Sequence, residues 1–111
     1  MGKTTKPFVT ILCSTFNSAK WIEGYLDCLN DQILENFDIV FVDAGSTDGS
    51  LHTIMDFEFR EGIGSKVLTA HGCGVYEAWN LAVAEAKTPY VMNFNTDDRL
   101  FSYGLITAKH L

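Results

Sequence analysis

The sequence predicts an α/β fold in which a mainly parallel sheet of about four strands is covered by helices in a three-layer, Rossmann-like arrangement. Three observations lead to this prediction. Short β-favouring runs alternate with amphipathic stretches along the 111 residues. One of these runs is apolar almost throughout, as in strands that helices cover on both faces. Polar residues collect where the runs end. Such alternation implies parallel strands joined by right-handed crossovers.

The first half of the chain predicts two strand–helix units. Residues 8–13 form a β-favouring run, and Asn17-Ser18 is a capping pair before a helix over residues 19–32. Residues 37–43 predict the second strand, and residues 44–49 a turn rich in cap-forming residues before a helix from Leu51 to about Glu58. The stripe of the first helix comprises Ile22, Leu26, Leu29 and Ile33, broadened by Trp21 and Tyr25.

The second half predicts two further strands and two further helices. Gly62 and Gly64 break the preceding helix, residues 66–69 form a short strand, and a glycine-bearing loop over residues 71–74 precedes a helix. Pro89 opens a strand over residues 90–95, and another helix is expected around residues 102–111. The helix before Pro89 has the clearest periodicity, with a core stripe of Val75, Ala78, Trp79, Ala82, Val83 and Ala86.

Composition excludes several classes of protein. Apolar residues make up 47% of the chain and charged residues 20%, which is typical of a packed globular domain. Eight basic against fourteen acidic residues give a net charge of −6, without a basic cluster, so we expect no nucleic-acid partner. A bound diphosphate would need backbone amides and a divalent cation to offset its charge.

The cysteines and the hydropathy pattern bear on cellular location. Cys13, Cys28 and Cys73 are odd in number and lack zinc-site spacing, so reduced thiols are expected. No apolar run approaches the length that crosses a bilayer. We therefore expect a cytoplasmic protein, and peripheral attachment to a membrane through segments outside this chain stays an open alternative.

The predicted sheet gathers polar side chains at one rim. Ser14, Thr15 and Asn17 follow the first strand, Asp43 closes the second, and Asp97 with Asp98 follows the fourth. Ligands of open α/β sheets bind outside the carboxyl ends of the strands. Hard cations such as Mg²⁺ or Mn²⁺ take one or two carboxylates together with phosphate oxygens. The rim is therefore a candidate site for a metal-bound phosphate ester, with different roles for the two adjacent aspartates.

Four blocks occur in the order seen in one enzyme family: FVTILCSTFN (residues 8–17), VDAGSTDGS (42–50), GVYEAWN (74–80) and NTDD (95–98). Together they resemble a family 2 glycosyltransferase of the GT-A fold. The resemblance implies that residues 1–111 are the nucleotide-sugar-binding part of a truncated domain whose acceptor-side half is absent. It further implies inverting sugar transfer from a UDP- or GDP-type sugar to a hydroxyl of a glycan, lipid or protein, as in polysaccharide biosynthesis.

The resemblance also assigns roles to individual residues. Asp98 matches the metal-binding aspartate of the family's DXD-like motif, and Asp97 matches a position that contacts the ribose or the metal's waters. Thr15 and Phe16 match the segment that lines the base, with Ser14 and Asn17 beside them, and Asp43 matches an acidic partner at the second strand. Ala44 stands where many relatives carry a second acidic residue. The general base of relatives lies beyond the acidic motif and has no match here.

Two alternatives stay open at this point. A non-catalytic nucleotide-sugar-binding or assembly module could keep the same fold, and an exposed apolar face could make the chain a homo-oligomer. A sugar-phosphate nucleotidyltransferase is disfavoured, because the segment after Cys13 lacks the glycine-rich, basic loop that cradles a triphosphate. Ser46, Thr47 and Asp48 are interpreted as helix-capping residues, and His71 as a loop residue.

Overall fold

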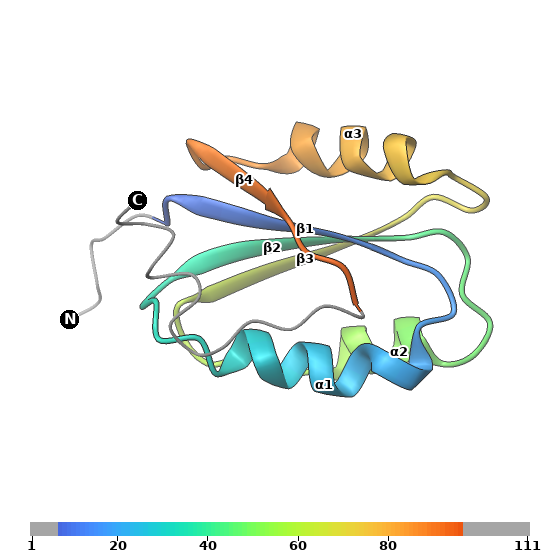
Figure 1. Cartoon of the computed structure of the whole chain (residues 1–111), viewed down its shortest axis with the longest axis horizontal. Coiled ribbons are helices and arrows are strands. Elements are labelled where there is room, and N and C mark those ends of the chain that lie inside the picture. Colours follow the sequence, from blue (N-terminus) through green and yellow to red (C-terminus); the bar gives the residue numbers. More distant parts are fainter. Residues whose placement is uncertain (1–6, 97–111) are drawn as a thin grey trace.

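The computed structural model describes residues 7–96, and within them strands and helices alternate as predicted (Figure 1). Asp97, Asp98 and the helix predicted around residues 102–111 lie outside the described residues. The elements are β1 (Val9–Thr15), α1 (Ala19–Asn30), β2 (Phe37–Asp43), α2 (Ser50–Asp56), β3 (Ile63–Thr69), α3 (Val75–Glu85) and β4 (Tyr90–Asn93).

The four described strands form one parallel sheet in the order β3-β2-β1-β4. Helices α1 and α2 cover one face of this sheet and α3 covers the other, so the fold has three layers (Figure 1). This confirms the predicted α/β class. The chain runs outward from β1 through β2 to β3 and then returns to β4 on the opposite side of β1. The order therefore reverses between β1 and β4, where ligands of such sheets bind.

Alternate residues of β1 supply the core on each face of the sheet. Ile11 and Cys13 pack into a large cluster with α1, whereas Leu12 packs with Ala78 and Ala82 of α3. Strand side chains alternate between faces, so β1 requires apolar residues at successive positions. This explains why β1 and β2 are apolar almost throughout, as expected for central strands covered on both sides.

Helix α1 also anchors the chain that leaves β4. Tyr25 is fully buried, stacks on Phe94 with ring centroids 5.0 Å apart, and donates its hydroxyl hydrogen to the Phe94 carbonyl oxygen at 2.7 Å. A phenol that buries its ring and satisfies its hydroxyl combines apolar packing with a directional bond. Tyr25 thereby fixes the segment that leads to Asn95 and Thr96.

Several element boundaries differ from the prediction by a few residues, among them the end of α1, the start of β3 and the end of β4, which stops at Asn93. Helix α1 ends at Asn30, and Ile33, which was predicted on its core stripe, lies outside the helix and is 46% exposed. The Arg60 guanidinium donates to main-chain carbonyls in this region, which holds the chain in a non-helical course. Strand β3 begins at Ile63, so Gly64 lies within a strand, where a Cβ atom would approach Asp38 Oδ1 to 2.9 Å.

The predicted core stripe of α3 is wrong in part. Ala78 and Ala82 are buried, but Val75 and Val83 are 53% and 48% exposed. The physical reason is that α3 lies over β1 and β2, while β4 at the edge is short and largely exposed. Trp21, also predicted to lie in the core, is 42% exposed. None of the helices in residues 7–96 combines the length and the apolar character that a membrane span requires.

Candidate functional site

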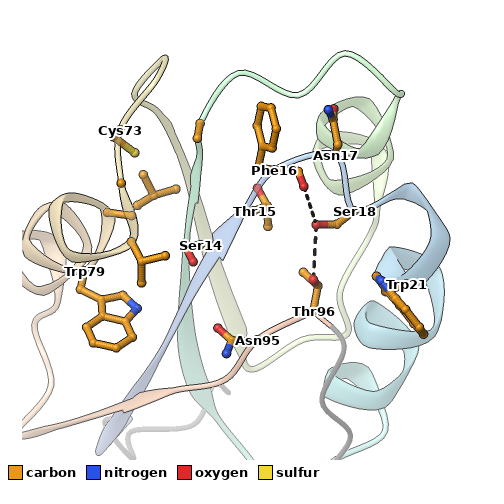
Figure 2. A pocket seen from close by; sticks show the side chains of 15 residues that line it. Ser14, Thr15, Phe16, Asn17, Ser18, Trp21, Cys73, Trp79, Asn95 and Thr96 are labelled. Carbon is orange, nitrogen blue, oxygen red and sulfur yellow. Dashed lines mark hydrogen bonds between the residues drawn. The ribbon is translucent and has the colours of Figure 1, made fainter.

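A pocket of about 430 Å³ opens at the carboxyl end of β1, where the strand order reverses. Its walls come from the segment after β1, the loop before α3, the first turns of α3 and the chain after β4 (Figure 2). The lining residues are Ser14, Thr15, Phe16, Asn17, Ser18, Trp21, Val42, Ala44, Cys73, Gly74, Val75, Ala78, Trp79, Asn95 and Thr96.

Four predicted site residues line this pocket together: Ser14, Thr15, Phe16 and Asn17. Phe16 is 58% exposed, so its ring is available to a planar ligand. The hydroxyl of Thr15 is already engaged, because it donates to Asp43 Oδ1 at 2.8 Å. The structure thus brings these side chains to one wall, and their contact with a nucleotide stays a prediction.

Asp43 does not line the pocket, although it closes β2 beside it. The residue is fully buried, and its two carboxylate oxygens accept four hydrogen bonds. Oδ1 accepts from the hydroxyls of Thr15 and Ser46 at 2.8 and 2.6 Å, and Oδ2 accepts from the amides of Gly45 and Ser46 at 2.9 and 2.8 Å. These bonds join the end of β1 to the loop after β2.

Burial alone would raise the pKa of Asp43, but the hydrogen bonds from Ser46, Thr15 and Gly45 outweigh it and hold the pKa below its usual value. Asp43 is therefore a charged residue whose acceptor capacity is used within the protein. In the geometry of this structure it organises the loop over residues 44–48, and its predicted contact with a ligand stays untested.

Hydrogen bonds join the loop after β1 to the loop after β2 at the pocket rim. Asn17 adopts a positive φ of 48°, its amide donates to Ser46 Oγ at 2.8 Å, and its Oδ1 accepts from the Thr47 amide at 2.8 Å. Asn tolerates this left-handed conformation better than most residues. The side chain of Asn17 therefore shapes the rim as well as lining it.

The Asp48 carboxylate accepts hydrogen bonds from the first amide of both neighbouring helices. Its Oδ2 accepts from the amide of Ala19, the first residue of α1, and its Oδ1 accepts from the amide of Ser50, the first residue of α2. The bond from Ala19 is the main reason that the pKa of Asp48 is lowered. The capping role predicted for Asp48 is confirmed, whereas Ser46 and Thr47 bond to the loops instead.

Gly45 shows how closely the loop before α3 approaches the loop after β2. Its φ is +108°, and a Cβ atom would lie 2.4 Å from Nδ1 of His71. A side chain is excluded here both by backbone conformation and by space. His71 is thus a packing partner of this loop, in agreement with its interpretation as a loop residue.

The sequence analysis assigned no site role to the remaining polar and aromatic residues of the described wall: Ser18, Trp21, Cys73, Trp79, Asn95 and Thr96. Trp79, Asn95 and Thr96 nevertheless lie in the blocks that carry the family resemblance. Asn95 and Thr96 could have been found from the strand-end rule, because they follow β4 directly. Trp79 was assigned to the core because it fits the helical stripe, and periodicity alone does not distinguish a core face from a pocket face.

The lining residues among 7–96 include no carboxylate, lysine or arginine. That part of the chain likewise brings no three His, Cys, Asp or Glu side chains together in a group that could hold a metal ion. Asp97 and Asp98 follow Thr96 in the sequence but lie outside the described residues. Thr96 itself is held by a hydrogen bond to Ser18 Oγ at 3.3 Å (Figure 2).

Comparison with proteins of known sequence finds relatives whose names refer to teichoic acid and teichuronic acid. It is 32% identical over 100 residues to the teichoic acid poly(glycerol phosphate) polymerase of Staphylococcus epidermidis, covering 87% of this chain and 14% of that protein. It is 27% identical over 94 residues to the putative teichuronic acid biosynthesis glycosyltransferase TuaG of Bacillus subtilis, covering 85% and 37%. The chain therefore spans only a minor part of these relatives.

Solved structures agree with this relationship. The crystal structure of S. aureus TarS 1-349 in complex with UDP matches with a TM-score of 0.80 and 25% identity, over 93% of this chain and 31% of that one. The complex of the same protein with UDP-GlcNAc matches with a TM-score of 0.81 and 28% identity, over 95% and 30%. The match confirms the GT-A type of fold.

The family model described as "Glycosyl transferase family 2" matches residues 10–103, which include all the described strands except the first residue of β1. This range contains every residue of the pocket wall as well as Asp97 and Asp98. The chain belongs to glycosyl transferase family 2.

Proposed function

We propose that the pocket binds a nucleotide-diphosphate sugar of the UDP or GDP type, and that residues 1–111 supply donor and metal binding for sugar transfer. The observation that carries this proposal is the pocket at the reversal of strand order, built from segments that lie within the family match. TarS, which shares this fold over nearly the whole chain, has been crystallised with UDP and with UDP-GlcNAc.

The chemistry of the pocket wall favours a divalent cation as part of the bound state. A diphosphate carries charge that must be offset, and the lining residues among 7–96 include no lysine or arginine. Asp43 cannot supply a free carboxylate, because its oxygens already accept four hydrogen bonds. We therefore assign Mg²⁺ or Mn²⁺ to Asp98, and the ribose or the metal's waters to Asp97.

The proposed reaction inverts the anomeric carbon of the sugar. An acceptor hydroxyl attacks that carbon and gives its proton to a carboxylate base, while the bond to the diphosphate oxygen breaks and the nucleoside diphosphate leaves. Asp98 would hold the cation, whose chemistry would be to stabilise the charge that develops on the leaving group. Because no carboxylate of residues 7–96 lines the pocket, we place the general base outside this segment.

A titration of UDP and GDP by calorimetry, with and without Mn²⁺, tests the binding step. We expect affinity for one of the two to rise at least tenfold with Mn²⁺, and Asp98→Ala to abolish that gain, because the carboxylate bonds the cation. Asp56→Ala is the matched control, since Asp56 is an exposed residue of α2 that pairs with His52. Equal affinity with and without metal would remove the assignment of Asp98.

The absence of a pocket carboxylate among residues 7–96 also favours a second candidate, a non-catalytic nucleotide-sugar-binding or assembly module. Both candidates bind the donor, so they are separated by release of UDP or GDP from the sugar nucleotide in the presence of acceptor glycans, measured with a protein that also carries the acceptor-side half and its general base. Turnover that depends on an acceptor supports the transferase. Tight metal-dependent binding without any turnover supports the module.

A further inference from the structure

Trp79 of α3 holds a hydrogen-bond donor that no residue of the described range 7–96 uses. Its indole nitrogen, Nε1, is shielded from solvent, and no acceptor in residues 7–96 lies within hydrogen-bonding distance. Buried polar groups in native structures almost always have a partner, so an exception calls for an explanation. Because Trp79 lines the pocket, a ligand bound there is a candidate for the missing acceptor.

The ring is held in a defined position on the pocket wall. Tyr76 meets it edge to face, with ring centroids 5.4 Å apart and an interplanar angle of 87°. Figure 2 shows the nitrogen-bearing edge of the indole turned toward the side of the pocket where Ser14 and Asn95 lie. The N–H group therefore lies on the pocket side of α3, although it has no accessible surface in the pocket itself.

Across the pocket from Trp79 lie two more aromatic side chains of the described lining, Phe16 and Trp21 (Figure 2). Both are substantially exposed, at 58% and 42%, so that wall offers ring faces on which a base can stack. A base placed there directs the remainder of the nucleotide sugar across the pocket toward α3. An indole N–H donates but does not accept, which suits the oxygen-rich diphosphate and sugar.

We propose that Trp79 is a donor-binding residue whose indole N–H bonds an oxygen of the diphosphate–sugar end of the ligand. This inference rests on the proposed function of the pocket and adds a residue that the family's acidic motif does not contain. Since Nε1 is shielded in the structure, ligand entry includes a small rotation of the indole. The part of the pocket wall formed by residues 7–96 has no lysine or arginine, so one directed neutral donor makes up a larger share of the donors that this part offers to a ligand.

The test follows the indole N–H directly by a proton–nitrogen correlation spectrum. The chain has two tryptophans, so comparison with the spectrum of Trp21→Phe identifies the Trp79 signal, which is then followed in the unmodified protein. We expect this signal to move downfield and its hydrogen to exchange more slowly with UDP-GlcNAc, but to stay in place with uridine. A shift with UDP as well assigns the acceptor to the phosphates; a shift with UDP-GlcNAc alone assigns it to the sugar. The guanosine series replaces these probes if GDP is the better ligand.

Trp79→Phe then measures the contribution of the bond to affinity. We expect the dissociation constant of the compound that shifts the signal to rise roughly three- to tenfold, with no change for the nucleoside. Tyr76→Phe is the matched control, because it alters a neighbouring exposed ring that does not line the pocket. A merely structural role of Trp79 would weaken all ligands alike.

Two results overturn the inference, and they are distinguishable from each other. Calorimetric binding of UDP-GlcNAc with an unmoved Trp79 signal, or a shift caused equally by the nucleoside, removes the role of Trp79 and leaves the proposed function intact. Failure of the unmodified protein to bind any nucleotide or sugar nucleotide removes the proposed function and this inference together. The spectrum decides the matter even if Trp79→Phe does not fold.

Discussion

At the scale of single residues, the main finding is that a charged side chain can be essential to the site without lining it. Asp43 accepts two hydroxyl and two amide hydrogens and is fully buried between β1 and the loop after β2. A buried carboxylate is tolerated only when its oxygens are satisfied in this way. The carboxylate therefore acts on the pocket by fixing the loop that carries Ala44.

Replacement of Asp43 by asparagine tests this structural role. One oxygen can still accept from the amides of Gly45 and Ser46, while the new NH₂ group faces the two hydroxyls, which can turn to accept. The charge-assisted part of the bonding is lost, so we expect the free energy of unfolding to fall by about 2 kcal/mol in a urea titration. Asp38→Asn on the same strand is the control and should cost much less, because burial raises the pKa of Asp38. Equal losses would contradict the role of Asp43.

At the scale of elements, the connection from α1 to β2 depends on a single side chain. The Arg60 guanidinium donates to five main-chain carbonyl oxygens, those of Asn30, Gln32, Leu34, Glu35 and Glu61. The last carbonyls of a helix have no partner within the helix and need one elsewhere. Arg60 supplies it, which explains why the helix ends at Asn30 although the apolar stripe continues to Ile33.

We expect Arg60→Met to lower the free energy of unfolding by about 2 kcal/mol, because three partly buried and two exposed main-chain carbonyls lose a charged donor at once. Arg60→Lys should recover little, since an ammonium group cannot reproduce the planar fork of five donors. Urea unfolding measures the loss, and faster amide exchange around residues 31–36 locates it. Lys66→Met is the control: Lys66 pairs with Glu85 at the surface, where ion pairs contribute little. A similar loss in both variants would argue against the role of Arg60.

At the scale of the whole molecule, the net charge of −6 bears on metal binding, and the short, exposed strand β4 bears on self-association. The excess of carboxylates opposes binding of a diphosphate unless a cation accompanies it, which connects the global charge to the proposed metal. The large apolar side chains of α3 and β4 that remain exposed include Val75, Tyr76, Leu81, Val83, Tyr90 and Val91. Self-association of the chain stays a prediction.

The stability of the whole domain should fall in acid through Asp43. Its folded-state pKa lies below the ordinary value of 3.8, so the unfolded chain takes up a proton first as the pH falls. The contribution of Asp43 is therefore fully present above about pH 5, and it decreases as the pH falls through 3.8 toward the folded-state pKa. Asp48 and Glu85 have lowered pKa values of the same sign but are exposed, so screening weakens their effect.

Urea titrations at several pH values between 2.5 and 7 measure this dependence, where the range is a choice of conditions about the ordinary pKa. We expect the difference in unfolding free energy between the unmodified protein and Asp43→Asn to be greatest at neutral pH and to shrink in acid. A difference that stays constant across this range would show that the charge of Asp43 is not the stabilising feature.

The sequence by itself determined the α/β class, the order of the elements and the rim on which polar residues gather. These follow from local periodicity and from the rule that parallel strands end on one side, and they placed Ser14 and Asn17 at the pocket. The tertiary structure alone decided that the carboxylate oxygens of Asp43 are fully hydrogen-bonded within the protein and that Val75 and Val83 are exposed. It also decided that Trp79 lines the pocket instead of packing in the core. Periodicity shows which face of a helix or strand is apolar. Whether that face packs in the core, lines a pocket or stays exposed depends on the strand order and on the short edge strand β4. Both arise only when segments that are distant in the sequence pack together.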